Sequence, residues 1–170
     1  MNDFSFAGIF LLRGDIMNAI EKYYSNYNEE KRLTHKNHLP EYLVTMKYIE
    51  KYLFPGAKIA EIGAGTGRYS IALAEKGYDV TAVELVDHNL NILKSKSKTH
   101  HNIKIYKGNA VDLSFLESAA YDLVLLLGPM YHLFTSEDKR RAMSEAIRIS
   151  KKGGTLRLFP LDTLKCKLIK

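Results

Sequence analysis

The sequence contains one cysteine and no tryptophan. A single thiol, Cys166, cannot form an internal disulfide, which fits a reducing compartment, and we expect a cytoplasmic protein. No run of about 18 apolar residues occurs, so the sequence predicts no membrane-spanning helix and no membrane partner. The apolar stretch 4–12 lacks a preceding basic region and a small-residue cleavage site, so it does not resemble a signal peptide.

The charge is moderately positive, with 25 Lys and Arg against 19 Asp and Glu, a formal net charge of +6. Such a balance raises the question of nucleic-acid binding. Lys94, Lys96 and Lys98 fall at the end of an expected helix, where lysine complements the helix dipole. Neither these lysines nor the basic tail 165–170 has the interleaved aromatics of single-strand binders. A solvated surface explains the charge, and nucleic acid is not the partner we expect.

The most informative segment has glycine at every second position, at Gly63, Gly65 and Gly67. An apolar strand at residues 58–62 runs into it, and an amphipathic segment follows from Arg68. Glycine permits a close approach between backbone and ligand, and a helix start offers free N–H groups with partial positive charge. The segment therefore predicts a nucleotide-like cofactor. The dinucleotide fingerprint would need glycine where Arg68 stands, which argues against a nicotinamide-dependent oxidoreductase.

The rest of the chain alternates strand and helix patterns. We expect strands at residues 58–62, 79–85, 103–106, 121–127 and 155–159. We expect helices at residues 39–53, 70–76 and 136–150, the last beginning at Ser136 as N-cap and stopped by Gly153 and Gly154. The first helix should pack on the sheet through Leu39, Leu43, Met46, Ile49 and Leu53, and the last through Ala142, Met143, Ala146, Ile147 and Ile149. This alternation predicts an α/β, doubly wound parallel sheet.

Glu84 ends the second expected strand, 21 positions after Gly63. An acid at this place can accept hydrogen bonds from both ribose hydroxyls of an adenosine. A solvated strand-end glutamate is the structural alternative, and the glycine loop upstream favours the binding interpretation.

The pattern from Glu61 through Gly63, Gly65 and Gly67 resembles the first motif of class I S-adenosylmethionine-dependent methyltransferases. Together with the segment 127–133, Leu-Gly-Pro-Met-Tyr-His-Leu, it is similar to a bacterial, small-molecule-type subgroup. The resemblance runs from about Met17 to Gly154. It implies S-adenosyl-L-methionine as cofactor and a Rossmann-like sheet of order 3-2-1-4-5. It also implies that the last helix and two strands of the usual seven-stranded sheet are missing.

The resemblance assigns roles to individual residues. Gly63, Ala64, Gly65 and Gly67 would pass beneath the methionine part of the cofactor, with Glu61 near its amino group. Glu84 would hold the ribose, Leu85 would pack on adenine, and Asn109 with Ala110 would line the adenine edge. Leu127 and Gly128 would approach the methionine part from the other side. Asn109 replaces a commoner acid, but its carbonyl oxygen can still accept a hydrogen bond from an adenine amino group.

His132 and Tyr131 are the candidate catalytic residues. An imidazole with an ordinary pKa of about 6.5 can remove a proton from the acceptor, or it can simply brace the turn after Pro129. Tyr131 can orient a substrate or pack. Tyr23, Tyr24 and Tyr27 suggest either a lid or an ordinary amphipathic helix. His35 and His38 have no accompanying cysteine or acid cluster, so we expect no metal site.

These patterns divide the chain into three parts. Residues 1–16 do not resemble a domain start, and we expect a non-native leader before a true start at Met17. Residues 17–54 form an N-terminal helical segment, and residues 55–170 form the α/β core, incomplete at its C-terminus through a frameshift or truncation. An uncovered edge strand there would invite self-association.

The resulting hypothesis is methyl transfer by in-line displacement to a small-molecule acceptor. The alternatives are a defunct or truncated cofactor-binding module without activity and, less favoured, a nicotinamide-dependent oxidoreductase.

Overall fold

A computed structural model describes Lys22 and residues 39–158. Its five strands form one parallel sheet in the order β3-β2-β1-β4-β5, which confirms the predicted fold class and strand order. The strands are β1 (Lys58–Ile62), β2 (Asp79–Glu84), β3 (Ile103–Lys107), β4 (Tyr121–Leu126) and β5 (Ser150–Leu158). The helices are α3 (Leu39–Glu50), α4 (Arg68–Glu75), α5 (Asp87–Lys96) and α6 (Ser136–Ile149), with a 3-10 turn η1 (Pro129–Tyr131).

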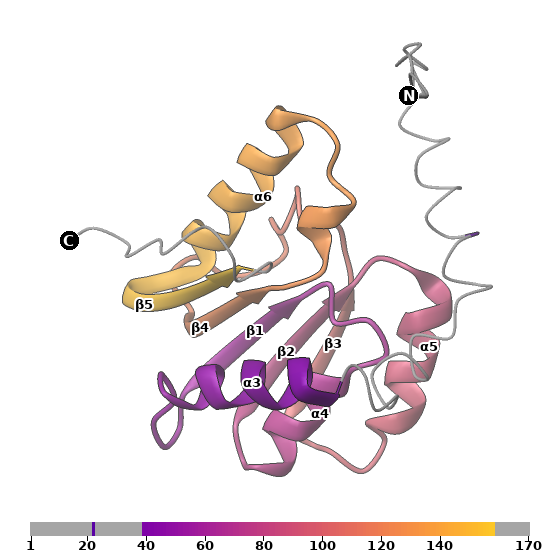
Figure 1. Ribbon diagram of the computed structural model, residues 1–170, viewed down its shortest axis with the longest axis vertical. Helices are drawn as coiled ribbons and strands as arrows, with labels where there is room; N and C mark the ends of the chain where they lie inside the picture. The colour runs from indigo at the N-terminus through magenta and orange to yellow at the C-terminus, as the bar shows by residue number, and fades with distance from the viewer. Residues whose placement is uncertain (1–21, 23–38, 159–170) are drawn as a thin grey trace, which may run out of the picture.

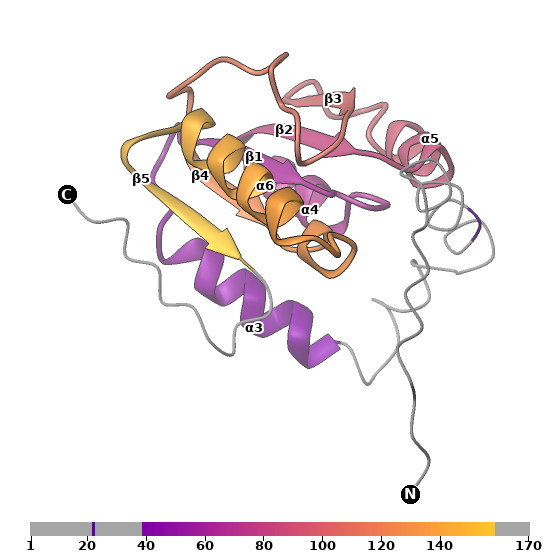
Figure 2. The ribbon, with the colours of Figure 1, turned by 90° about the horizontal axis from the view of Figure 1, so that it is seen from above.

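Helices cover both faces of this sheet, with α6 on one side and α3 and α4 on the other (Figure 1). Ala142, Ala146 and Ile149 of α6 pack in one cluster with alternate residues of β1 and β4. Met46 and Ile49 of α3 pack on the opposite face. Seen from above, β3 with α5 and the edge strand β5 lie at opposite ends of the sheet (Figure 2). Burial on both faces explains the unbroken apolar run of β4.

The predicted packing face of α3 is partly wrong. Leu39 and Leu43 are 41% and 56% exposed, whereas Thr45, Met46 and Ile49 are buried. Tyr42 takes the inward position instead, with its ring centroid 5.3 Å from that of Tyr69. The helix also ends at Glu50 rather than at residue 53, although Leu53 still packs on the same cluster.

The N-cap and the packing face of α6 differ from the prediction. The N-cap is Thr135 rather than Ser136, because the Thr135 Oγ1 accepts a hydrogen bond from the Asp138 N–H at 3.0 Å. Of the residues predicted to face the sheet, Ala142, Ala146 and Ile149 are buried, but Ile147 is 44% exposed. The N-cap lies one residue before the predicted position, and one predicted packing residue is exposed. The helix itself lies where the sequence predicted it.

The start of β5 is the larger error, because the strand begins at Ser150 and includes both glycines that were predicted to precede it. The pairing of β5 with β4 shifts register between Tyr121 and Leu123. Gly153 has a φ of +80°, and a Cβ on Gly154 would lie 2.9 Å from the Lys151 carbonyl oxygen. The two glycines therefore make an irregularity within the strand rather than a helix stop.

Several predictions fall on residues 1–21, 23–38 and 159–170: the leader, the start at Met17, the tyrosine lid, the basic tail and the missing last elements. They lie outside the described residues. Within the described part, no helix is long and apolar enough to cross a membrane. β5 pairs with β4 alone among the described strands, and self-association through its other edge stays a prediction.

Arg148 of α6 makes hydrogen bonds to residues 113–116, in the segment that follows β3. It donates to the carbonyl oxygens of Leu113 at 2.7 Å and Leu116 at 3.0 Å, and it pairs with Glu145. We expect Arg148→Met to lower the free energy of unfolding by about 2 kcal/mol, because two carbonyls and a carboxylate lose their donor. Urea denaturation would measure this. Arg140→Met is the matched control and should cost under about 0.5 kcal/mol, since Arg140 is exposed and pairs with Glu137 within α6. Equal losses would contradict the assigned role.

Candidate functional site

The carboxyl ends of the parallel strands meet at one edge of the sheet, and four segments leave from it. These segments are residues 63–67 after β1, Glu84 and Leu85 at the end of β2, residues 108–110 after β3, and residues 127–128 after β4. Hydrogen bonds join three of them. The N–H groups of Gly63 and Ala64 donate to the Val83 carbonyl at 2.8 and 3.0 Å, and that of Gly108 donates to the Glu84 carbonyl at 3.1 Å. The structure thus brings together the residues that the sequence singled out after these strands.

The glycine loop has left-handed backbone at Gly63, Gly65 and Gly67, with φ of +78°, +57° and +85°. A Cβ on Gly63 would lie 2.5 Å from Pro129 Cδ, and one on Gly67 would lie 2.2 Å from Leu93 Cδ1. Two of the three glycines are therefore required by contacts within the chain, in addition to any close approach of a ligand.

Glu84 lies against this loop. It is 5% exposed, and its carboxylate accepts hydrogen bonds from the N–H of Gly65 at 2.7 Å and of Val86 at 2.9 Å. Burial raises the pKa of Glu84, while these backbone hydrogen bonds lower it. A carboxylate offers about four lone-pair sites. Hydrogen bonds from the Leu85 N–H and the Asn89 side chain also lower the pKa of Glu84, so ribose hydroxyls would share its oxygens with these donors. The acid holds the loop, and a diol would bind to the same two carboxylate oxygens.

Glu61 is buried one residue before the end of β1, on the α4 side. The Ser70 hydroxyl donates a hydrogen bond to its Oε2. Burial raises the pKa of Glu61 to about 8, although the hydrogen bonds from Ser70 lower it, and the nearby Glu84 charge raises it further. The side chain is therefore mostly protonated at neutral pH. A cationic group close by would favour its ionised form.

The segment after β3 is held by its own side chains. Asn109 Oδ1 accepts a hydrogen bond from the Val111 N–H at 3.2 Å, so one of its two lone pairs is used within the turn. Ala110 is buried, and Leu85 is half-buried directly after β2. A Cβ on Gly108 would lie 2.6 Å from Cζ of the exposed Phe115, so a larger residue there would require this ring to move. These residues lie where the sequence placed them, and their contacts with a ligand stay a prediction.

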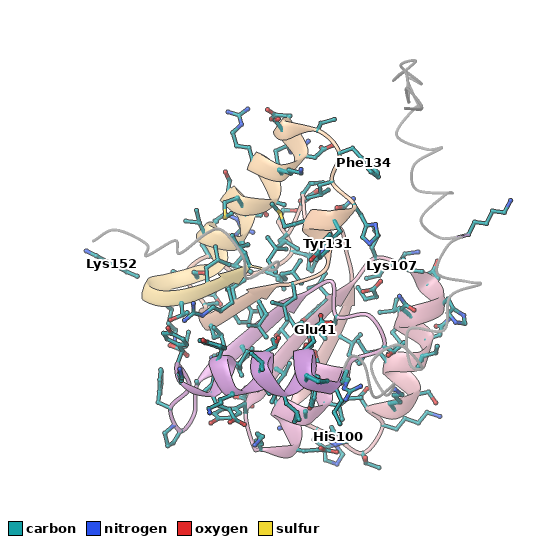
Figure 3. The ribbon with its side chains drawn as sticks, in the orientation of Figure 1. Glu41, His100, Lys107, Tyr131, Phe134 and Lys152 are labelled. Carbon is teal, nitrogen blue, oxygen red and sulfur yellow. The ribbon has the colours of Figure 1, made fainter. Side chains whose placement is uncertain are left out.

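The segment after β4 carries the two candidate catalytic residues. The half-buried Leu127 and Gly128 lead into η1, whose Pro129 ring faces Gly63. The His132 N–H donates to the Pro129 carbonyl at 2.9 Å, so His132 closes this turn. Tyr131 is 56% exposed, and Phe134, in the same connection between β4 and α6, is 70% exposed (Figure 3). Both aromatic rings are exposed in the connection whose Pro129 contacts the glycine loop, and Phe134 was not predicted.

Sequence reasoning missed two residues of the site. Ser70 binds Glu61, and Arg68 stacks on Tyr42 with its guanidinium carbon 4.0 Å from the ring centroid. Ser70 and Arg68 lie in the first turn of α4, just after the glycine loop, and this position is the one sequence feature that could have indicated a role in the site. The partners come from β1 and α3, which sequence spacing does not reveal.

No group of three or more potential metal ligands occurs in the described part of the chain. His35 and His38 lie outside it.

Comparison with known proteins identifies similar chains. Residues 59–154 match a family model described as a methyltransferase domain. A demethylmenaquinone methyltransferase of Renibacterium salmoninarum is 30% identical over 60% of this chain and 40% of its own length. Its counterpart in Bacillus pumilus is 30% identical over 80% of this chain and 58% of its own. The chain thus spans about half the length of these curated relatives.

A solved structure supports the fold. The phosphoethanolamine N-methyltransferase 1 of Haemonchus contortus, in complex with phosphoethanolamine and S-adenosylhomocysteine, superposes with a TM-score of 0.71. It is 18% identical, and the match covers 87% of this chain and 33% of that one. At this identity the likeness shows the arrangement of strands and helices, and no more.

Proposed function

This chain belongs to the methyltransferase-domain family, and from that premise we propose that it binds S-adenosyl-L-methionine and transfers its methyl group to a small-molecule acceptor. The observation that carries the proposal is the contact between Glu84 and the Gly65 N–H at 2.7 Å. It places an acid able to bind a diol directly against a left-handed glycine loop, in a family that uses this cofactor. The small-molecule acceptor is supported by the names of the curated relatives.

The residues present fit this cofactor. Glu84 would accept hydrogen bonds from the two ribose hydroxyls, sharing its oxygens with the donors of the protein. Gly63, Gly65 and Gly67 give a backbone turn along which the methionine part can lie. The carboxyl group of Glu61 would then lie near the cofactor amino group. Leu85, Asn109 and Ala110 would line the adenine, with Leu127 and Gly128 on the other side of the methionine part.

When bound, S-adenosylmethionine supplies a methyl group that its sulfonium has already activated for displacement. The protein must mainly align the acceptor with the methyl carbon and exclude competing geometries. Tyr131 and Phe134 are exposed aromatic rings in the connection between β4 and α6 and can contact an acceptor. Where the acceptor nucleophile carries a proton, His132 is the group in this segment that can take it.

The experiment that tests the proposal is thermal unfolding with saturating S-adenosylhomocysteine or with NAD. A ligand that binds only the folded chain at about 100 times its Kd stabilises it by about 2.7 kcal/mol. For a domain of this size, that raises the midpoint by roughly 5–10 °C. We expect this shift with S-adenosylhomocysteine and none with NAD.

Two variants sharpen this experiment. Glu84→Gln should lose most of the shift, because an amide offers one acceptor oxygen where the carboxylate offers two. The matched control Glu117→Gln changes an exposed glutamate and should keep the shift. A shift with NAD alone would favour the oxidoreductase alternative, and no shift with either ligand would overturn the proposed function.

A further inference from the structure

Arg68 is the first residue of α4 and directly follows Gly67, the last glycine of the loop. Its guanidinium carbon lies 4.0 Å from the ring centroid of Tyr42 in α3, so the cation stacks on an aromatic face. Stacking uses the flat face of the guanidinium and leaves the N–H groups at its edge available for hydrogen bonds.

One of those edge groups has no partner. The Nη1 atom of Arg68 is buried and makes no hydrogen bond. Buried polar groups in folded proteins are almost always paired, and leaving a charged donor unpaired is costly. Arg157 also has such a nitrogen, so the orphan atom alone does not indicate a ligand. What distinguishes Arg68 is its place directly after the glycine loop, where a ligand of the proposed site would supply the missing acceptor.

The chemistry of arginine identifies the class of ligand. Its planar fork of N–H donors matches the two oxygens of a carboxylate, with which it forms bidentate, charge-assisted hydrogen bonds. Tyr42 already fixes the plane of the guanidinium, so little side-chain freedom remains to be lost on binding.

We propose that Arg68, stacked on Tyr42, binds a carboxylate presented at the glycine loop. The inference rests on the proposed function and deepens it. Two sources can present such a group: the methionine part of the cofactor, or an acceptor molecule that carries its own carboxylate.

The test compares the wild-type chain with Arg68→Met by calorimetric titration of two ligands. S-adenosylhomocysteine carries the carboxylate, and 5′-methylthioadenosine has the adenosine and thioether without it. If the cofactor presents the carboxylate, S-adenosylhomocysteine should bind the variant at least 10-fold more weakly, while the affinity for 5′-methylthioadenosine stays unchanged. The unchanged affinity also shows that the variant is folded. Arg68→Lys keeps the charge without the planar fork, so its affinity for S-adenosylhomocysteine should lie between those of the wild type and Arg68→Met. It replaces Arg68→Met in the test if that variant does not fold.

A second arm tests the acceptor as the source. Benzoate is added to each protein saturated with S-adenosylhomocysteine. If the acceptor presents the carboxylate, the thermal midpoint should rise for the wild type and not for Arg68→Met; if the cofactor presents it, neither midpoint should rise.

Arg157→Met is the matched control. Arg157 stacks on Tyr52 at 3.7 Å and also has an unpartnered buried nitrogen, but it lies on β5, two strands away from β1. Its loss should leave both titrations unchanged. If Arg68→Met binds S-adenosylhomocysteine as the wild type does and responds to benzoate identically, the inference is overturned. A wild type that does not bind S-adenosylhomocysteine would overturn the proposed function instead, so the two failures are distinguishable.

Discussion

Replacing Gly63 by alanine is expected to lower the free energy of unfolding by about 2–5 kcal/mol and to abolish cofactor binding. Two costs add. An alanine at the φ of +78° observed here is strained by about 1–2 kcal/mol. Its Cβ would also lie 2.5 and 2.6 Å from Cδ and Cγ of Pro129, and such an overlap costs about 1–3 kcal/mol. Because a proline ring cannot rotate away, either the 3-10 turn or the glycine loop must move, and both border the proposed site.

Two further variants separate these costs in urea denaturation. Gly77 has a φ of +87°, but a Cβ added there would have no other atom within 4 Å, so Gly77→Ala should cost only about 1–2 kcal/mol. Pro129→Ala removes Cγ and Cδ, and in the Gly63→Ala background it should restore the part of the loss that comes from overlap. A double-mutant cycle measures this as a coupling of about 1–3 kcal/mol. If Gly63→Ala and Gly77→Ala cost the same and show no coupling to residue 129, the Pro129 contact is not what requires glycine.

The contact between Gly63 and Pro129 also illustrates what the sequence could not reveal. The alternating glycines predicted a turn whose backbone can approach a ligand closely, and the structure has a left-handed loop there. The reason for glycine at position 63 is a ring from another segment, 66 positions further along the chain. Local patterns report backbone conformation, whereas the partner depends on how β1 and β4 lie side by side in the sheet.

The fold itself was largely predictable, because β1 and β4 are buried on both faces and their apolar runs carry that signal. The errors occurred where tertiary contacts override local preference. Tyr42 rather than Leu43 turns inward because it meets Arg68 and Tyr69. Gly153 and Gly154 read as a helix stop, yet they fit within β5, where the pairing with β4 is irregular.

The candidate site divides in the same way. The position of Glu84 at a strand end followed from the alternation of elements, since all parallel strands end at one edge. The roles of Ser70 and Arg68 did not follow, because each depends on a side chain from a different element. Hydrogen-bond and stacking partners across the fold, at Glu61 and at Tyr42, decide what these residues can do.

The second large effect concerns Glu61, whose replacement by glutamine should remove much of the decline in stability between about pH 5 and pH 8. Burial raises the pKa of Glu61 to about 8 in the folded chain, against 4.5 as its ordinary value. Between these values the folded chain holds a proton that the unfolded chain has released. The free energy of unfolding is therefore highest below the ordinary pKa and falls as the pH rises toward 8. The accumulated loss is on the order of a few kcal/mol.

The measurement is urea denaturation of the wild type and Glu61→Gln at a series of pH values. Glutamine cannot ionise but can still accept the hydrogen bond from Ser70, so the variant should match or fall slightly below the wild type at pH 5 and exceed it above pH 8. Glu84 contributes a slope of the same sign, because burial raises its pKa too, and it is present in both proteins. The difference between the two curves therefore isolates Glu61. Glu117→Gln, at an exposed position, should run parallel to the wild type at every pH. Parallel curves for Glu61→Gln as well would mean that Glu61 is ionised in the folded chain at neutral pH, and that a cationic group is not needed to charge it.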